Sequence, residues 1–129
     1  MPRVRKYVKN DYRMICQWLK DRGMDKPLPA SLSSVGYVCD ERVVGFIYLT
    51  DSNVCLIEGI IANPHTVPSL RRDSIKHLSQ FLIDKALSMG YKNIISTTYH
   101  PTIAKLAESL GFVCNPHLKV YALREKDLQ

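Results

Sequence analysis

Three apolar runs lie close together between residues 35 and 62, and they limit the folds open to this chain more than any other feature. The runs 35–40, 43–50 and 54–62 are rich in β-branched and aromatic residues, which is typical of strands. Only two and three residues connect them, whereas a crossover to a parallel strand needs about a dozen. We therefore predict an antiparallel meander of three strands, with Glu41-Arg42 as its first tight turn.

Helices are indicated on both sides of this meander. Asn10 or Asp11 caps a first helix whose apolar residues share one face, and Gly23 ends it. A second helix begins at Pro68 and continues to Gly90, with apolar residues at helical spacing. The other predicted elements are a strand over 3–8, a loop over 24–34, a strand over 92–98, a helix over 101–110 and a strand over 118–123.

This order of elements predicts an α/β fold of the mixed α+β kind, in which helices flank a central mixed sheet that begins with the antiparallel meander. A length of 129 residues with 46% hydrophobic residues suits one core, so we expect a single domain over residues 1–129. No run approaches the roughly 18 apolar residues of a membrane span, and no targeting segment is evident. We expect a soluble cytoplasmic protein without a membrane partner.

The formal charge of +6 indicates a surface that attracts phosphates, acidic peptides or nucleic acid. A CoA-type cofactor, an acidic protein and a polynucleotide would each explain it, and so would ordinary solubility. The four cysteines show neither a Cys-x-x-Cys pair nor a Cys/His ligand spacing, so no metal site is predicted. Because the sequence has no helix-turn-helix, aromatic stacking or zinc pattern, a nucleic-acid-binding module ranks last among the candidate functions.

Two motifs in the second half of the chain are similar to those of a known family. The run 57–64, Ile-Glu-Gly-Ile-Ile-Ala-Asn-Pro, resembles a strand that ends in apolar-x-x-Pro before a cofactor loop. The run 100–112, His-Pro-Thr-Ile-Ala-Lys-Leu-Ala-Glu-Ser-Leu-Gly-Phe, resembles a stretch that continues from Asn through Leu-Tyr-Glu-x-Leu-Gly-Phe. Together with the element order, they resemble the GNAT (Gcn5-related N-acetyltransferase) superfamily over about residues 34–124.

The resemblance implies acetyl-CoA as co-substrate, bound where two strands splay apart. The backbone of Ile60, Ile61 and Ala62 would pair with the pantetheine arm like an added strand. The pyrophosphate would bind to a loop at a helix N-terminus, over residues 71–76. The cofactor-binding residues implied there are Arg71, Arg72, Ser74, Ile75 and Lys76.

In the family, this loop has Arg or Gln, two further residues, Gly, one residue, and then Gly or Ala. In this chain the first small residue is Ser74, and the second is replaced by Lys76. A long side chain at this position either blocks the approach of the phosphate to the backbone or adds a positive charge to the same anion. Asp73 adds an opposing negative charge. The alternative interpretation of residues 71–76 is an exposed, charged helix start.

Acyl transfer to an amine needs a base for the amine proton, donors for the oxyanion and an acid for the departing thiolate. Glu58 interrupts an apolar strand at a position often acidic in the family, so it is the candidate base; the alternative is a solvated or arginine-paired carboxylate. The family's tyrosine is replaced by Ala107, which leaves Tyr99 and His100 as candidate acids. His100 also stands where many relatives have a cofactor-contacting asparagine, and its alternative is a surface or capping role.

We therefore predict an N-acetyltransferase that transfers an acetyl group from acetyl-CoA to an amine. The segment 24–34, which largely sets acceptor choice in the family, is short, so we expect a protein, a peptide or another bulky acceptor. The alternative is a catalytically inactive binding or regulatory protein of the same fold that contacts nucleic acid or an acidic partner. Exposed sheet edges also make a homodimer plausible.

Overall fold

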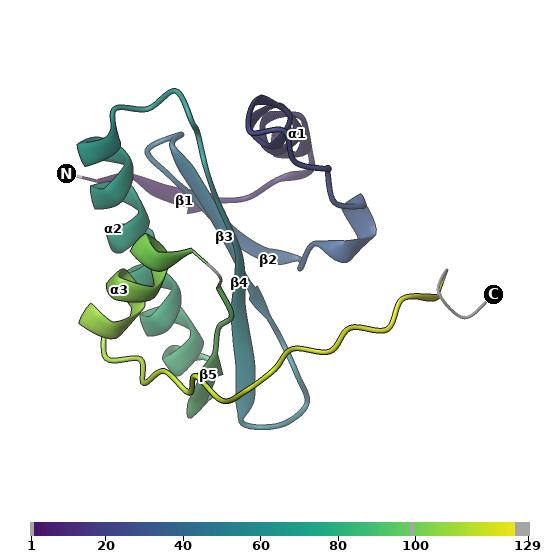
Figure 1. Cartoon of the computed structure of the whole chain (residues 1–129), viewed down its shortest axis with the longest axis vertical. Coiled ribbons are helices and arrows are strands. Elements are labelled where there is room, and N and C mark those ends of the chain that lie inside the picture. Colours follow the sequence, from purple (N-terminus) through teal and green to yellow (C-terminus); the bar gives the residue numbers. More distant parts are fainter. Residues whose placement is uncertain (1, 99, 126–129) are drawn as a thin grey trace. The chain divides into compact units, whose positions relative to one another are not determined.

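The computed structural model describes residues 2–98 and 100–125, which are drawn in colour in Figure 1. The chain divides into two compact units, residues 1–97 and 98–129, which are described separately below. The strands are β1 (Val4–Lys6), β2 (Val35–Cys39), β3 (Val43–Tyr48), β4 (Val54–Ala62) and β5 (Asn93–Ile95). The helices are α1 (Tyr12–Asp21), α2 (Pro68–Ser88) and α3 (Pro101–Ser109), with short 3-10 helices at Lys9–Asp11 and Pro29–Ser31. The single domain expected from the sequence stays a prediction.

In the part of the chain that the structure describes, five strands form one sheet in the order β1-β2-β3-β4-β5. Each neighbouring pair is antiparallel except β4 and β5, which are parallel. This confirms the predicted mixed sheet and its antiparallel meander. None of the helices in residues 2–98 and 100–125 combines the length and the apolar character needed to cross a membrane.

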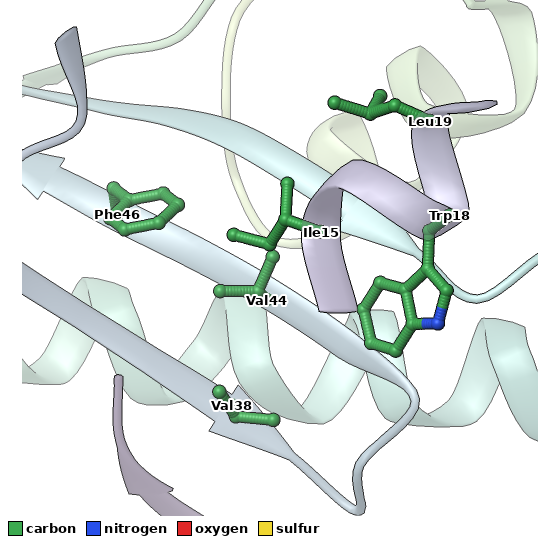
Figure 2. Packing of buried hydrophobic residues seen from close by; sticks show 6 residues of the cluster. All are labelled: Ile15, Trp18, Leu19, Val38, Val44 and Phe46. Carbon is green, nitrogen blue, oxygen red and sulfur yellow. The ribbon is translucent and has the colours of Figure 1, made fainter. Parts of the chain in front are cut away.

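One face of the sheet forms a core with α1 (Figure 2). The buried side chains of this cluster are Ile15, Trp18, Leu19, Val38, Val44 and Phe46. Phe46 is fully buried, and its ring meets that of Tyr7 edge-on with the centroids 5.0 Å apart. The apolar face predicted for the first helix is therefore the face that packs on the sheet.

The opposite face is covered by α2, whose Leu78 and Leu82 are fully buried. Gly45 of β3 lies beneath this helix. A Cβ at residue 45 would come within 2.6 Å of Ile60 Cδ1 and 2.8 Å of Leu82 Cδ1. Only glycine allows such a close approach, so β3 and β4 are held firmly between the two helices.

The turn between β2 and β3 lies one residue earlier than predicted. Asp40 and Glu41 both have φ of 55°, and Arg42 N donates to the carbonyl of Cys39 at 2.9 Å. A two-residue turn with both φ values positive matches the right-handed twist of a hairpin. Its geometry explains why Asp40 occupies a turn position that the strand-like pattern had assigned to the preceding strand.

Arg5 joins this turn to the start of α1 through two carboxylates. Its guanidinium donates to Asp11 Oδ1 at 2.8 Å and Oδ2 at 2.9 Å, and its Nε donates to Glu41 Oε1 at 2.6 Å. Asp11 also accepts a hydrogen bond from Val8 N and is only 9% exposed. The Arg5 guanidinium lowers the pKa of Asp11 below its ordinary value because it stabilises the ionised carboxylate.

Asp11→Asn is expected to destabilise the fold by about 1–3 kcal/mol at pH 7, because charge-assisted hydrogen bonds are lost. A lowered pKa means that this stabilisation is fully present above about pH 4 and is lost as the pH falls through the lower pKa of the folded state. Urea unfolding of both proteins at pH 7 and about pH 2 measures the difference. The difference in the free energy of unfolding between wild type and variant should be smaller at low pH. Asp84→Asn, on the exposed side of α2, serves as the control. A difference independent of pH would contradict the ion pair.

The second unit contains α3, which begins at Pro101 as predicted. His100 is its N-cap, and Nδ1 of the ring accepts a hydrogen bond from Thr102 N at 3.3 Å. The strand predicted over 118–123 is wrong, because these residues form no strand. Alternating apolar residues indicate only that a strand can form. A strand also needs a paired neighbour, and β5 pairs with β4 alone among the described residues.

Candidate active site

The parallel pairing of β4 and β5 is much shorter than β4 itself. The paired residues are Val54 with Asn93, Cys55 with Ile94 and Leu56 with Ile95. Beyond Leu56, β4 continues to Ala62, and no strand among the described residues pairs with it on the β5 side. We call this part of β4, residues 57–62, the open edge. Its backbone offers hydrogen-bond donors and acceptors to a ligand that carries amide groups.

A β-bulge lies within the open edge. Phe46 pairs with Glu58 and Val44 with Ile61, so two residues of β4 stand opposite the single residue between Val44 and Phe46. Gly59, the first of the two, has φ of +70°, and a Cβ there would lie 3.0 Å from Phe46 Cδ2. A bulge bends its strand and increases the local twist, which is consistent with the early end of the β4–β5 pairing.

Glu58 lies just beyond the last β4–β5 pair and reaches across to the chain that follows β5. Its Oε1 accepts one hydrogen bond from Thr97 N at 2.8 Å and another from Thr97 Oγ1 at 3.0 Å. No arginine among the described residues pairs with it. The carboxylate is half-buried and fixed in position, which suits a candidate base better than a freely solvated side chain.

The residues expected to bind the pantetheine arm lie on the open edge. Ile61 and Ala62 pair with β3 on their other side, and Ile60 points toward Gly45. The carbonyl of Ala62 is already engaged, because Arg22 donates to it from Nη2 at 3.1 Å and from Nε at 3.3 Å. Cofactor binding by Ile60, Ile61 and Ala62 stays a prediction. Because Arg22 occupies the Ala62 carbonyl, we do not count it among the acceptors that the open edge offers to a ligand.

The prediction that residues 71–76 form a loop at a helix N-terminus is wrong. The helix α2 begins at Pro68, so these residues lie within its regular turns. Pro68 is preorganised for the first helical position, and no glycine follows it to delay the helix. Arg71 N already donates to the carbonyl of Val67 at 2.9 Å, and its guanidinium holds the preceding loop by donating to the carbonyls of Pro64 and Thr66.

Ser74 and Ile75 face the interior of the unit. Ser74 is 2% exposed, donates to Asp40 Oδ2 at 3.3 Å and accepts from Arg42 Nη1 at 3.5 Å. Ile75 is a core residue. The exposed residues of the predicted phosphate-binding set are Arg72 and Lys76, so any contact with an anion falls first to these two side chains.

The candidate acids, Tyr99 and His100, stand between β5 and α3 in the sequence. Tyr99 lies outside the described residues. His100 belongs to the second unit, where it caps α3. Their catalytic roles stay predictions.

A surface hollow of about 360 Å³ lies between the segment before β2 and the end of β3. It is lined by Ala30, Ser31, Leu32, Ser33, Ser34, Tyr48 and Leu49, none of them charged. Tyr48 pairs with Leu56, next to the pair of Phe46 with Glu58, so Tyr48 and Glu58 lie on the same face of the sheet. Burial, together with the nearby charge of Glu58, raises the pKa of Tyr48.

Sequence reasoning did not find Thr97, Tyr48 or Arg22. A threonine after a strand and a tyrosine within one are common, so their types alone carry no signal. Thr97 is recognisable as a partner of Glu58 only when the register of β4 and β5 is known. Leu56 pairs with Ile95, so two residues further on from each, Glu58 stands opposite Thr97.

No protein-family model matches this sequence, and no curated protein matches it either. Solved structures do share its fold. An acetyltransferase from Trypanosoma brucei superposes with a TM-score of 0.69 at 16% identity, covering 95% of this chain and 100% of that chain. Glucosamine-6-phosphate N-acetyltransferase from Arabidopsis thaliana gives 0.67 at 15% identity, covering 96% and 99%. A predicted acetyltransferase from Clostridium acetobutylicum, solved with acetyl-CoA, gives 0.66 at 12% identity, covering 95% and 96%.

These likenesses extend over nearly the whole length of each protein, and the identities are too low to show more than the fold. The expected resemblance is thereby confirmed at the level of architecture. The chain has the fold of the GNAT-type acetyltransferases.

Proposed function

We propose that this protein is an acetyl-CoA-dependent N-acetyltransferase that acts on an amine of a protein, a peptide or another bulky acceptor. The observation that carries the proposal is the open edge of β4, which carries near its beginning a carboxylate, Glu58, fixed by two hydrogen bonds. The fold of known acetyltransferases supports it.

Acetyl-CoA supplies the activated acyl group. The backbone of Ile60 and Ile61 fits the amides of an extended arm, because this edge has no strand partner among the described residues. Glu58 accepts the proton of the acceptor amine, directly or through water, while the amine nitrogen bonds to the acetyl carbon. The bond from carbon to sulfur then breaks, and CoA leaves as its thiolate with the electron pair of that bond. Backbone amides near Ile60 and Ile61 are the candidate donors to the oxyanion.

The short segment between α1 and β2 favours a bulky acceptor. The segment between α1 and β2 contributes only the short 3-10 helix Pro29–Ser31 and lines an open hollow rather than a closed chamber. The Arabidopsis neighbour is named for a small sugar phosphate, so the fold by itself does not select an acceptor. The uncharged lining indicates that recognition there depends on hydrogen bonds and shape.

The first test is calorimetric titration of the purified protein with acetyl-CoA and with CoA. Micromolar binding of both is expected. Adenosine diphosphate is the matched control, because it has a pyrophosphate and no arm. Binding of acetyl-CoA without binding of adenosine diphosphate supports recognition through the open edge. No binding of acetyl-CoA would contradict the proposal.

A second candidate function is recognition without turnover. One observation favours it: residues 71–76 are helical, and Ser74 is tied to Asp40 and Arg42 instead of facing a phosphate. A GNAT-type fold that does not bind acetyl-CoA would then serve as a binding or regulatory protein for an acidic partner or nucleic acid. The same titration separates the two candidates.

A further inference from the structure

Thr97 is the sole hydrogen-bonding partner of the Glu58 side chain among the described residues. Both of its donors, the backbone N–H and the hydroxyl, meet the same oxygen, Oε1. The described residues donate no hydrogen bond to Oε2. The carboxylate is therefore held on one side and left available on the other.

The register of the sheet explains why these two residues meet. Leu56 pairs with Ile95, and continuing the parallel register by two residues places Glu58 opposite Thr97. No backbone pairing is present there, because β5 ends at Ile95. The Glu58 carboxylate accepts the N–H of Thr97, so a side chain replaces a ladder hydrogen bond at the point where the strands separate.

We propose that Thr97 is the positioning residue of Glu58: it fixes Oε1 and thereby directs Oε2 toward the proton of the acceptor amine. This inference rests on the proposed function, in which Glu58 is the base. Two donors on one oxygen stabilise the ionised carboxylate and restrict its rotation. Loss of the hydroxyl leaves the carboxylate less well oriented, because only the backbone N–H of Thr97 then holds Oε1.

Three variants test this role. Thr97→Val keeps the shape and the backbone donor but removes the hydroxyl, and Thr97→Ser restores the hydroxyl. Ser88→Ala removes a hydroxyl that donates to the carbonyl of Lys85 at the end of α2, and it controls for the general effect of losing one such bond. Thermal melting of all three shows whether each variant is folded.

The first measurement is the NMR order parameter of the Glu58 side chain, which needs neither cofactor nor acceptor. Thr97→Val should lower this order parameter, because one of the two hydrogen bonds that hold Oε1 is lost. Thr97→Ser and Ser88→Ala should leave it unchanged. An unchanged order parameter in Thr97→Val would overturn the proposal.

The second measurement determines kcat and KM for the acceptor separately. Thr97→Val should lower kcat about tenfold with KM close to the wild-type value, and Thr97→Ser should be close to wild type in both. A lower order parameter in Thr97→Val with an unchanged kcat would overturn the catalytic part of the inference. Should the wild type show no turnover, the proposed function fails, whereas the NMR result still decides whether Thr97 holds Glu58.

Discussion

Glu58→Gln is expected to lower kcat/KM by about 10²- to 10⁴-fold, the usual contribution of a general base. The amide has nearly the same shape as the carboxylate but cannot accept the proton of the amine. Its carbonyl oxygen can still accept both hydrogen bonds from Thr97, so the local structure should persist. The affinity for acetyl-CoA should stay within about twofold of wild type, because the proposed mode of binding uses the backbone of the open edge and not the carboxylate.

Steady-state rates across pH, together with calorimetric titration of both proteins, measure this effect. Glu108→Gln is the matched control, since Glu108 is an exposed carboxylate on α3. An equal rate in Glu58→Gln and wild type at every pH would remove Glu58 from the role of base.

Most of the fold of residues 1–97 could be predicted from local patterns. The meander of β2, β3 and β4 follows from apolar runs with connections too short for a crossover, and β4 has the predicted bounds. The face of α1 that packs on Val44 and Phe46 follows from helical spacing. These features depend on residues that are close together in the sequence, so a local pattern is enough to predict them.

The start of α2 shows how a family pattern can mislead. Residues 71–76 occupy the place of a phosphate-binding loop in the resemblance, but that loop depends on small residues with free backbone donors. Here the helix begins at Pro68, as the residues of the segment themselves predict, and the donor of Arg71 is used within it. The pattern of the family was applied to a stretch whose own residues favour a helix.

Only part of the candidate site could be predicted from the sequence, and the reason is related. Glu58 was recognisable because a carboxylate inside an apolar run is unusual. Its partner Thr97 lies 39 residues further along the chain, and only the strand register brings the two together. The strand expected over 118–123 failed on the same ground, because pairing is a long-range property that a local alternation of residues does not contain.

Phe46→Ala is expected to destabilise the protein by about 3–5 kcal/mol and to lower Tm by about 10 °C or more, the largest effect on stability that we predict. Phe46 is fully buried in the cluster beneath α1, and its ring meets Tyr7 edge-on. Alanine leaves a cavity that the neighbouring side chains cannot fill, because Val44 is fixed on a central strand. Chemical unfolding measures the loss. Leu28→Ala, at a side chain 71% exposed, should change stability by less than about 0.5 kcal/mol.

Phe46 also connects the core to the candidate site. Phe46 pairs with Glu58, and its ring lies against Gly59, the residue at which the bulge begins. Phe46→Leu fills most of the space and should cost less stability than Phe46→Ala, yet it removes the flat ring beneath the bulge. If the ring supports the bulge, Phe46→Leu should lower kcat/KM more than its modest effect on stability explains. Equal losses of stability in Phe46→Ala and Leu28→Ala would contradict the packing on which both the core and the position of Glu58 depend.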